Sequence, residues 1–201
     1  MSQTLVLAFV PGVTPAKWVG VWKDRMPRVP IDLRPLSEAD ALHSLRAGDA
    51  TVALLREPFD RAGLSAIPLY EERAVVVAPK DHPIAAFVEL SRADLVDENL
   101  LDGDARDAVE LVAANVGVAI MPQSVARLHS RKDVVARLLH DEPTTQICLA
   151  WLENGTTELV EEFIGIVRGR TANSSRGTVA PPAEKPAPKK TQNRPAKPRR
   201  R

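Results

Sequence analysis

Cysteine is almost absent from this sequence of 201 residues, and the single example, Cys148, lies in an apolar run. One cysteine excludes an intramolecular disulfide and a thiolate metal cluster, which fits a reducing compartment. Long hydrophobic runs are also lacking, because none approaches the roughly 20 residues that a membrane helix needs. The first apolar stretch, residues 5–10, is too short for a signal-peptide core and follows no basic residue. We therefore expect a soluble, cytoplasmic protein.

Catalytic patterns are missing as well. No nucleophile and base stand at a spacing that suggests a catalytic pair, so we expect no enzymatic activity and no cofactor. The histidines stand on separate predicted elements, and none has a second histidine or cysteine three or four residues away to share a metal ion: His43, His82, His129 and His140. We expect His82, which precedes a proline, to stabilise a turn and the others to lie at the surface.

Three acidic residues, Asp102, Asp104 and Asp107, cluster in the middle of the chain. A calcium loop of the EF-hand type needs a glutamate at its twelfth position, which this segment lacks. We expect a solvated turn that caps a helix, and no metal site.

Charge is divided unevenly along the chain. Residues 171–201 contain nine basic residues and one acidic residue, a net charge of +8, whereas residues 1–170 carry a net charge of −7. The segment after residue 170 is rich in Pro, Lys and Arg. It cannot bury enough apolar area to offset an ordering entropy of about 1–2 kcal/mol per residue. We predict that residues 171–201 form a disordered basic tail.

The basic tail suggests a partner. Polybasic segments bind nucleic acid by releasing counterions. Without aromatic residues the tail has no stacking platform, so such binding would ignore base sequence. The alternative is a solubilising or merely unconstrained extension. The residues expected to contact phosphates are Lys189, Lys190, Arg194, Lys197, Arg199, Arg200 and Arg201.

The first part of the chain predicts alternating strands and helices. Thr14 is the expected N-cap of a helix with Pro15 in its first turn, and Ser37 is the expected N-cap of a second helix that ends at Gly48. Parallel pairing is expected between strands at residues 4–10, 31–34 and 51–55. In such a sheet, ligands bind beyond the carboxyl ends of the strands.

The same kind of pattern continues through residue 169. Strands are predicted at residues 67–70, 74–78, 100–102, 116–120, 134–138 and 146–151. Helices are predicted at residues 105–114 and 124–130, and Thr156 or Thr157 is expected to cap a last helix.

Four stretches of this sequence, in this order and spacing, resemble the effector-binding (substrate-binding) domain of LysR-type transcriptional regulators. They are residues 5–12 (LVLAFVPG), 44–55 (SLRAGDATVALL), 67–85 (IPLYEERAVVVAPKDHPIA) and 110–122 (ELVAANVGVAIMP). The resemblance implies two Rossmann-like lobes, similar to periplasmic binding proteins, with a small effector in the cleft. It also implies a homodimer in which the first helix packs against a late helix of the partner.

Residues matched to the family's motifs would line this cleft. They are Pro11, Gly12, Val13 and Thr14 in the first loop, then Ser37, Arg56, and the turn Asp102, Gly103 and Asp104. Free N–H groups at the starts of two helices, together with the donors of Thr14, Ser37 and Arg56, favour a small organic anion. The alternative is that Thr14 and Ser37 only cap their helices and that Arg56 pairs with Glu57 or Asp60 at the surface.

Two tryptophans on the first predicted helix, Trp18 and Trp22, form an apolar stripe with Met26. Aromatic residues at helical spacing are commonly core residues. The resemblance would instead place them in a dimer interface, and two tryptophans do not easily share one narrow stripe. Both roles therefore stay open.

We predict an α/β protein with a substrate-binding domain at residues 1–170. The first lobe is expected at about residues 1–80 plus the helix at 156–169, and the second lobe at about 81–150. The family's N-terminal helix-turn-helix is absent before the first strand, and a helix and a strand are missing between Leu101 and Ala108, so the second lobe is expected to be truncated. The predicted function is sensing of a small-molecule effector. The alternatives are a small enzyme, or an interaction protein with a degenerate cleft that binds nucleic acid through its tail.

Overall fold

The structure is a computed structural model that describes residues 4–170. The predictions of a disordered tail and of nucleic-acid contacts fall on residues 171–201 and lie outside the described part. No helix within residues 4–170 is both long enough and apolar enough to cross a membrane.

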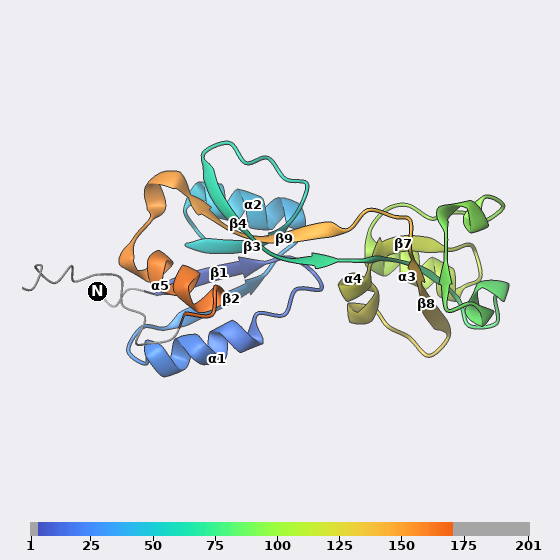
Figure 1. The fold of residues 1–201 in the computed structure, drawn as a ribbon, viewed down its shortest axis with the longest axis horizontal. Coiled ribbons are helices and arrows are strands. Elements are labelled where there is room, and N and C mark those ends of the chain that lie inside the picture. Colours follow the sequence, from blue (N-terminus) through green and yellow to red (C-terminus); the bar gives the residue numbers. More distant parts are fainter. Residues whose placement is uncertain (1–3, 171–201) are drawn as a thin grey trace, which may run out of the picture. The chain divides into compact units, whose positions relative to one another are not determined.

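The first sheet has five strands in the order β2-β1-β3-β9-β4 (Figure 1). Their bounds are β1 (Leu5–Phe9), β2 (Ile31–Pro35), β3 (Val52–Arg56), β4 (Leu64–Glu72) and β9 (Thr145–Leu152). The predicted parallel pairing is confirmed for β1 with both β2 and β3. β9 runs antiparallel to both of its neighbours.

Three helices pack on this sheet, with α2 on one face and α1 and α5 on the other (Figure 1). Their bounds are α1 (Ala16–Arg25), α2 (Glu38–Ala47) and α5 (Glu158–Val167). The predicted caps of α2 and α5 are confirmed, because the Ser37 and Thr157 side chains accept backbone N–H groups of their first turns. α2 ends as expected at Gly48, which adopts a φ of +79°.

The second sheet has four strands in the order β6-β8-β5-β7. These are β5 (Ala74–Pro79), β6 (Glu89–Leu90), β7 (Ala119–Pro122) and β8 (Val134–Leu139), accompanied by α3 (Ala105–Ala113) and α4 (Gln123–Leu128). The strand predicted at residues 100–102 is reduced to a single parallel bridge between Leu100 and Val118. Short 3₁₀ helices complete the order at η1 (Pro83–Ala86), η2 (Arg92–Leu95) and η3 (Glu153–Gly155).

Two strands lie in the opposite lobe from the one that the sequence predicted. β5, expected in the first lobe, belongs to the second sheet, and β9, expected in the second lobe, belongs to the first sheet. The physical reason is burial: residues 147–150 of β9 are fully buried between β3 and β4. A strand that apolar needs neighbours on both edges and cover on both faces. The chain therefore crosses between the sheets at Arg73 and again after β8.

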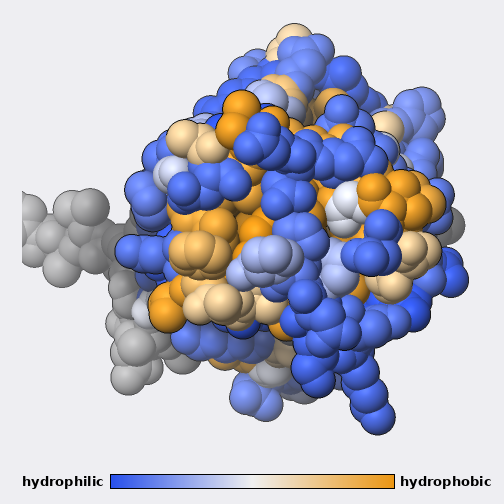
Figure 2. Space-filling view, turned by 90° about the vertical axis from the view of Figure 1, so that its right-hand side faces the viewer, coloured by the Kyte–Doolittle hydropathy of each residue, from blue (hydrophilic) through white to orange (hydrophobic). Residues whose placement is uncertain are grey.

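Polar side chains cover most of the face seen in Figure 2, and apolar side chains gather in patches between them. The second-sheet region exposes several large apolar side chains, including Phe87, Val88, Val96, Leu111 and Val116. Single exposed apolar residues are normal for a folded protein.

Candidate functional site

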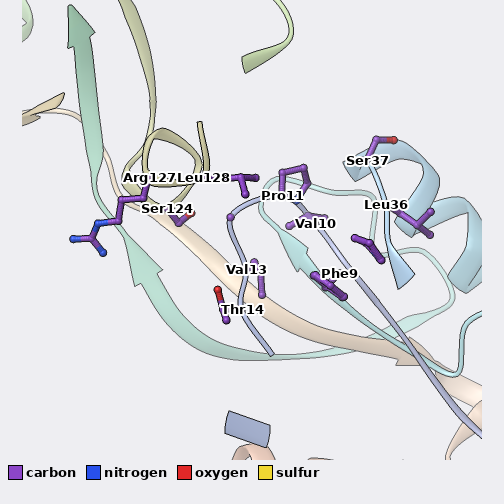
Figure 3. Close-up of a pocket in the computed structure, with 12 residues that line it drawn as sticks. Phe9, Val10, Pro11, Val13, Thr14, Leu36, Ser37, Ser124, Arg127 and Leu128 are labelled. Carbon is purple, nitrogen blue, oxygen red and sulfur yellow. The ribbon is translucent and has the colours of Figure 1, made fainter. Parts of the chain in front are cut away.

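The nine residues predicted to line the cleft all line one or both of two neighbouring cavities that share Pro11 and Ser37. The first-loop cavity has a volume of about 560 Å³ and is drawn in Figure 3. Its lining consists of Phe9, Val10, Pro11, Gly12, Val13, Thr14, Pro35, Leu36, Ser37, Ser124, Arg127 and Leu128. Apolar side chains form most of this wall.

The acidic cavity, as we call the second one, has a volume of about 470 Å³. It lies between the ends of first-sheet elements and the second-sheet elements α3, β7 and α4. Its lining consists of Pro11, Ser37, Glu38, Arg56, Leu101, Asp102, Gly103, Asp104, Ala105, Ala108, Ala119, Ile120, Met121, Pro122 and Val125. Both cavities are bordered by residues from the two lobes, as expected for a cleft site.

Gly12 holds the loop after β1 against the start of α4. Its φ is +84°, and a Cβ atom at this position would lie 2.4 Å from the Ser124 Oγ and 2.9 Å from the Val125 nitrogen. A side chain would therefore be strained by the backbone conformation and would also clash with α4. Glycine permits the contact that joins the first loop to the second lobe.

The two predicted hydroxyl donors differ in their roles. The Ser37 hydroxyl accepts the Asp40 N–H at 3.1 Å and donates to the Asp40 carboxylate at 2.7 Å. Thr14 was expected to cap α1, and this prediction is wrong, because Pro15 is the N-cap and makes no side-chain cap bond. Thr14 is exposed and lies at the end of the first-loop cavity opposite to Ser37 (Figure 3).

Arg56 forms a buried bridge instead of a surface ion pair. Its Nε donates to Glu72 Oε2 at 2.9 Å and its Nη1 to Glu38 Oε1 at 2.6 Å. Its Nη2 donates to the Pro11 carbonyl at 2.9 Å and, more weakly, to Ser124 Oγ at 3.4 Å. The Arg56 side chain is only 6% exposed. Protein acceptors thus take four hydrogen bonds from Arg56, the residue expected to donate to an anion.

The alternative partners predicted for Arg56 are wrong. Glu57 pairs with Arg61 and Asp60 with Arg46. Glu72, the buried partner of Arg56, lies 16 residues further along the chain. Its carboxylate lies beside Tyr70, and the pKa of the Tyr70 phenol is raised chiefly by burial and further by that charge.

The acidic turn caps α3, as predicted. Asp104 Oδ1 accepts the backbone N–H groups of Arg106 at 2.9 Å and Asp107 at 3.4 Å. Among the described residues, no group of three or more His, Cys, Asp or Glu side chains is arranged to hold a metal ion. His82 stabilises a turn, as predicted, because its Nδ1 accepts the Ile84 N–H at 3.3 Å.

The two tryptophans separate into different roles. Trp22 is fully buried, packs edge-on against Phe163 at a centroid distance of 5.9 Å, and donates its ring N–H to the Val29 carbonyl. A dimer contact through Trp22 is therefore excluded, and the core interpretation holds for this residue. Trp18 is only partly buried against the same core.

Sequence reasoning missed the contribution of α4. Ser124, Arg127 and Leu128 line the first-loop cavity, although they follow the loop at residues 11–14 by more than 100 residues. A signal was present, because α4 starts directly after Pro122 at the carboxyl end of β7. Helix starts at strand ends are where α/β proteins place ligand sites.

Comparison with known proteins identifies the domain. Residues 1–107 and 103–172 match the family model of the LysR substrate binding domain. The chain belongs to this family. The junction of the two matched segments falls where the sequence predicted a shortened second lobe of the LysR domain.

Relatives of this LysR domain are transcriptional regulators. The Hca operon transcriptional activator HcaR of Escherichia coli is 23% identical over 205 residues, covering 86% of this chain and 69% of the relative. A probable hydrogen peroxide-inducible genes activator of Mycobacterium avium is 25% identical over 199 residues, covering 83% of this chain and 64% of the relative. The chain thus spans about two thirds of the length of these relatives.

Solved structures share the fold. The BenM effector binding domain with its effector benzoate is 17% identical, with a TM-score of 0.72, covering 84% of this chain and 91% of that chain. A hydrogen peroxide-bound OxyR mutant from Corynebacterium glutamicum is 20% identical, with a TM-score of 0.68, covering 83% of this chain and 66% of that chain. The predicted two-lobed effector-binding fold is confirmed.

Proposed function

We propose that this LysR substrate-binding domain senses a small organic carboxylate, without turning it over, as part of a cytoplasmic transcriptional regulator. The first-loop cavity carries the proposal, because it combines a mostly apolar wall with a few hydroxyl groups and the start of α2. Pockets of this composition hold small amphipathic ligands. Benzoate, the effector of the related BenM domain, is such a molecule.

Local electrostatics support placing the carboxylate in this cavity. The first N–H groups of a helix have no intrahelical partner and favour negative charge, and α2 begins next to Ser37 in the wall. Arg127 is the cation among the lining residues, although its guanidinium points away from the cavity centre in Figure 3. A rotamer change would bring this exposed side chain toward a bound anion.

Peroxide sensing is the competing function, because several relatives are named as peroxide-inducible activators. Cys148 does not fit a reactive thiol. It is fully buried in β9, and burial raises its pKa to about 11. The thiolate is the reactive form, so a raised pKa suppresses oxidation at neutral pH. We therefore favour a carboxylate effector.

Thermal-shift screening of the full chain against a panel of monocarboxylates, including benzoate, tests the proposal. A bound effector raises Tm in proportion to its occupancy. Leu128→Trp narrows the first-loop cavity at a side chain that is 57% exposed, so the fold should tolerate it and the ligand-induced shift should disappear. Leu111→Trp, at an exposed position on α3 outside both cavities, should keep the shift. Conversion of the ligand during incubation, or no stabilisation by any carboxylate, would refute the proposal.

We propose a second, independent contact for residues 171–201, whose net charge of +8 favours binding to nucleic acid irrespective of base sequence. A chain ending at Arg170 should lose DNA retardation at low salt. Equal retardation by both chains would refute this contact.

A further inference from the structure

The acidic cavity has an excess of negative charge. Arg56 is the cation among its lining residues, and two carboxylates already bind it, Glu38 at 2.6 Å and Glu72 at 2.9 Å. This cluster alone has a net charge of −1. Asp102 and Asp104 add two further carboxylates to the wall of the same cavity.

Protein acceptors take four hydrogen bonds from Arg56, which leaves at most one of its five N–H groups for an incoming anion unless a partner leaves. Glu72 is fixed, because its side chain is 5% exposed beneath Arg56 and its departure would leave a buried charge unpaired. Glu38 is the partner that faces the cavity, with a side chain that is 59% exposed. An anionic group that enters this cavity therefore faces the carboxylates of Glu38, Asp102 and Asp104 in its wall.

The two cavities differ in charge although they adjoin at Pro11 and Ser37. The first-loop cavity has Arg127 as its charged lining residue, whereas the acidic cavity has three lining carboxylates against one cation, Arg56, which the buried Glu72 also binds. A ligand that spans both cavities would thus have one end where negative charge is favoured and the other end where it is disfavoured.

We infer that the effector has a single anionic group, seated in the first-loop cavity, and that Glu38 excludes a second one from the acidic cavity. The inference rests on the proposed carboxylate-sensing function and narrows it to monocarboxylates whose far end is uncharged or cationic. Glu38 is then a specificity-determining residue that selects against dicarboxylates.

Terephthalate and its monoamide test this inference, because they share one shape and differ by one negative charge. Calorimetric titration of the full chain should show at least about tenfold tighter binding of the monoamide. One unit charge a few ångströms away in a water-like medium changes an equilibrium constant about fivefold. E38Q should therefore reduce the preference for the monoamide about fivefold, and D102N should also reduce this preference. D24N removes the same charge from the exposed surface of α1 and should leave the preference unchanged.

The outcomes separate the inference from the proposed function. Equal affinity for the two compounds in the wild-type chain, or a preference that E38Q leaves intact, overturns the role of Glu38 while carboxylate sensing stands. Binding of benzoate without binding of either larger compound also overturns it, since the acidic cavity would then receive no part of the ligand. If no monocarboxylate binds the wild-type chain, the proposed function fails and the inference falls with it.

Discussion

Replacing Gly12 by alanine tests the contact between the first loop and α4. Alanine in a left-handed conformation costs about 1–2 kcal/mol. The added Cβ would also lie 2.9 Å from both the Ser124 carbonyl carbon and the Val125 nitrogen, which are backbone atoms that cannot rotate away. Overpacking of this kind costs about 1–3 kcal/mol more. The total is about 2–5 kcal/mol, unless α4 moves aside.

Gly48→Ala is the matched control for this variant. Gly48 has a nearly equal φ of +79°, but a Cβ there would meet nothing within 4 Å. Gly48→Ala should therefore show only the free-energy cost of alanine in a left-handed conformation. Each kcal/mol lowers Tm by about 2–4 °C for a chain of this size, so Gly12→Ala should lower Tm at least twice as much as Gly48→Ala by scanning calorimetry. Gly12→Ala should also abolish stabilisation by a carboxylate. Equal Tm losses for the two variants would refute the packing argument.

Three further predictions concern single side chains. Glu72→Gln should destabilise the chain by about 2 kcal/mol in urea unfolding, because Arg56 keeps only exposed Glu38 as a counter-ion. The neighbouring Glu71→Gln should change the unfolding free energy little, and equal effects of the two variants would contradict the buried bridge. The folded pKa of Cys148 is about 11 against an ordinary value near 9, so the contribution of its thiol to stability is present below about pH 9 and lost as the pH rises toward 11. The wild-type chain should therefore lose more unfolding free energy than Cys148→Ala between pH 9 and 11. Parallel curves of unfolding free energy against pH would refute the raised pKa. Trp18 is only partly buried within one chain, so its ring has surface left for the homodimer that the family resemblance predicts. Trp18→Ala should therefore convert a homodimer to monomer in light scattering, and a wild-type chain that is already monomeric at micromolar concentration would refute that prediction.

Local signals predicted most of the elements, because caps and strand ends depend on residues close in sequence. Ser37, Gly48 and Asp104 act at helix ends as expected. Thr14 failed as a cap since the chain already turns at Pro15, whose backbone is helical. Patterns of this kind describe one element at a time and carry no record of which sheet a strand joins. The exchange of β5 and β9 between the lobes is the result.

The candidate site was predicted in location but not in chemistry. The loop residues gather around the two cavities because carboxyl ends of neighbouring parallel strands meet at one edge. The partners of Arg56 could not be read from the sequence, since Glu72 reaches it through the strand order of the first sheet and Ser124 through the contact of α4 with the first lobe. From the charge of Arg56 alone, we expected its N–H groups to bind a ligand, whereas the protein's own acceptors bind most of them.

The placement of β9 has a consequence for biosynthesis. β3 and β4 have both left the ribosome well before the strand that lies between them has been made, because β9 ends at Leu152. Until β9 is made, the edges of β3 and β4 that will pair with it have no neighbouring strand, while the whole second sheet is synthesised. Such non-local pairing folds slowly and leaves edges open to wrong partners. The nascent chain should be most vulnerable to aggregation in this interval, and chaperone occupancy should fall once β9 has emerged.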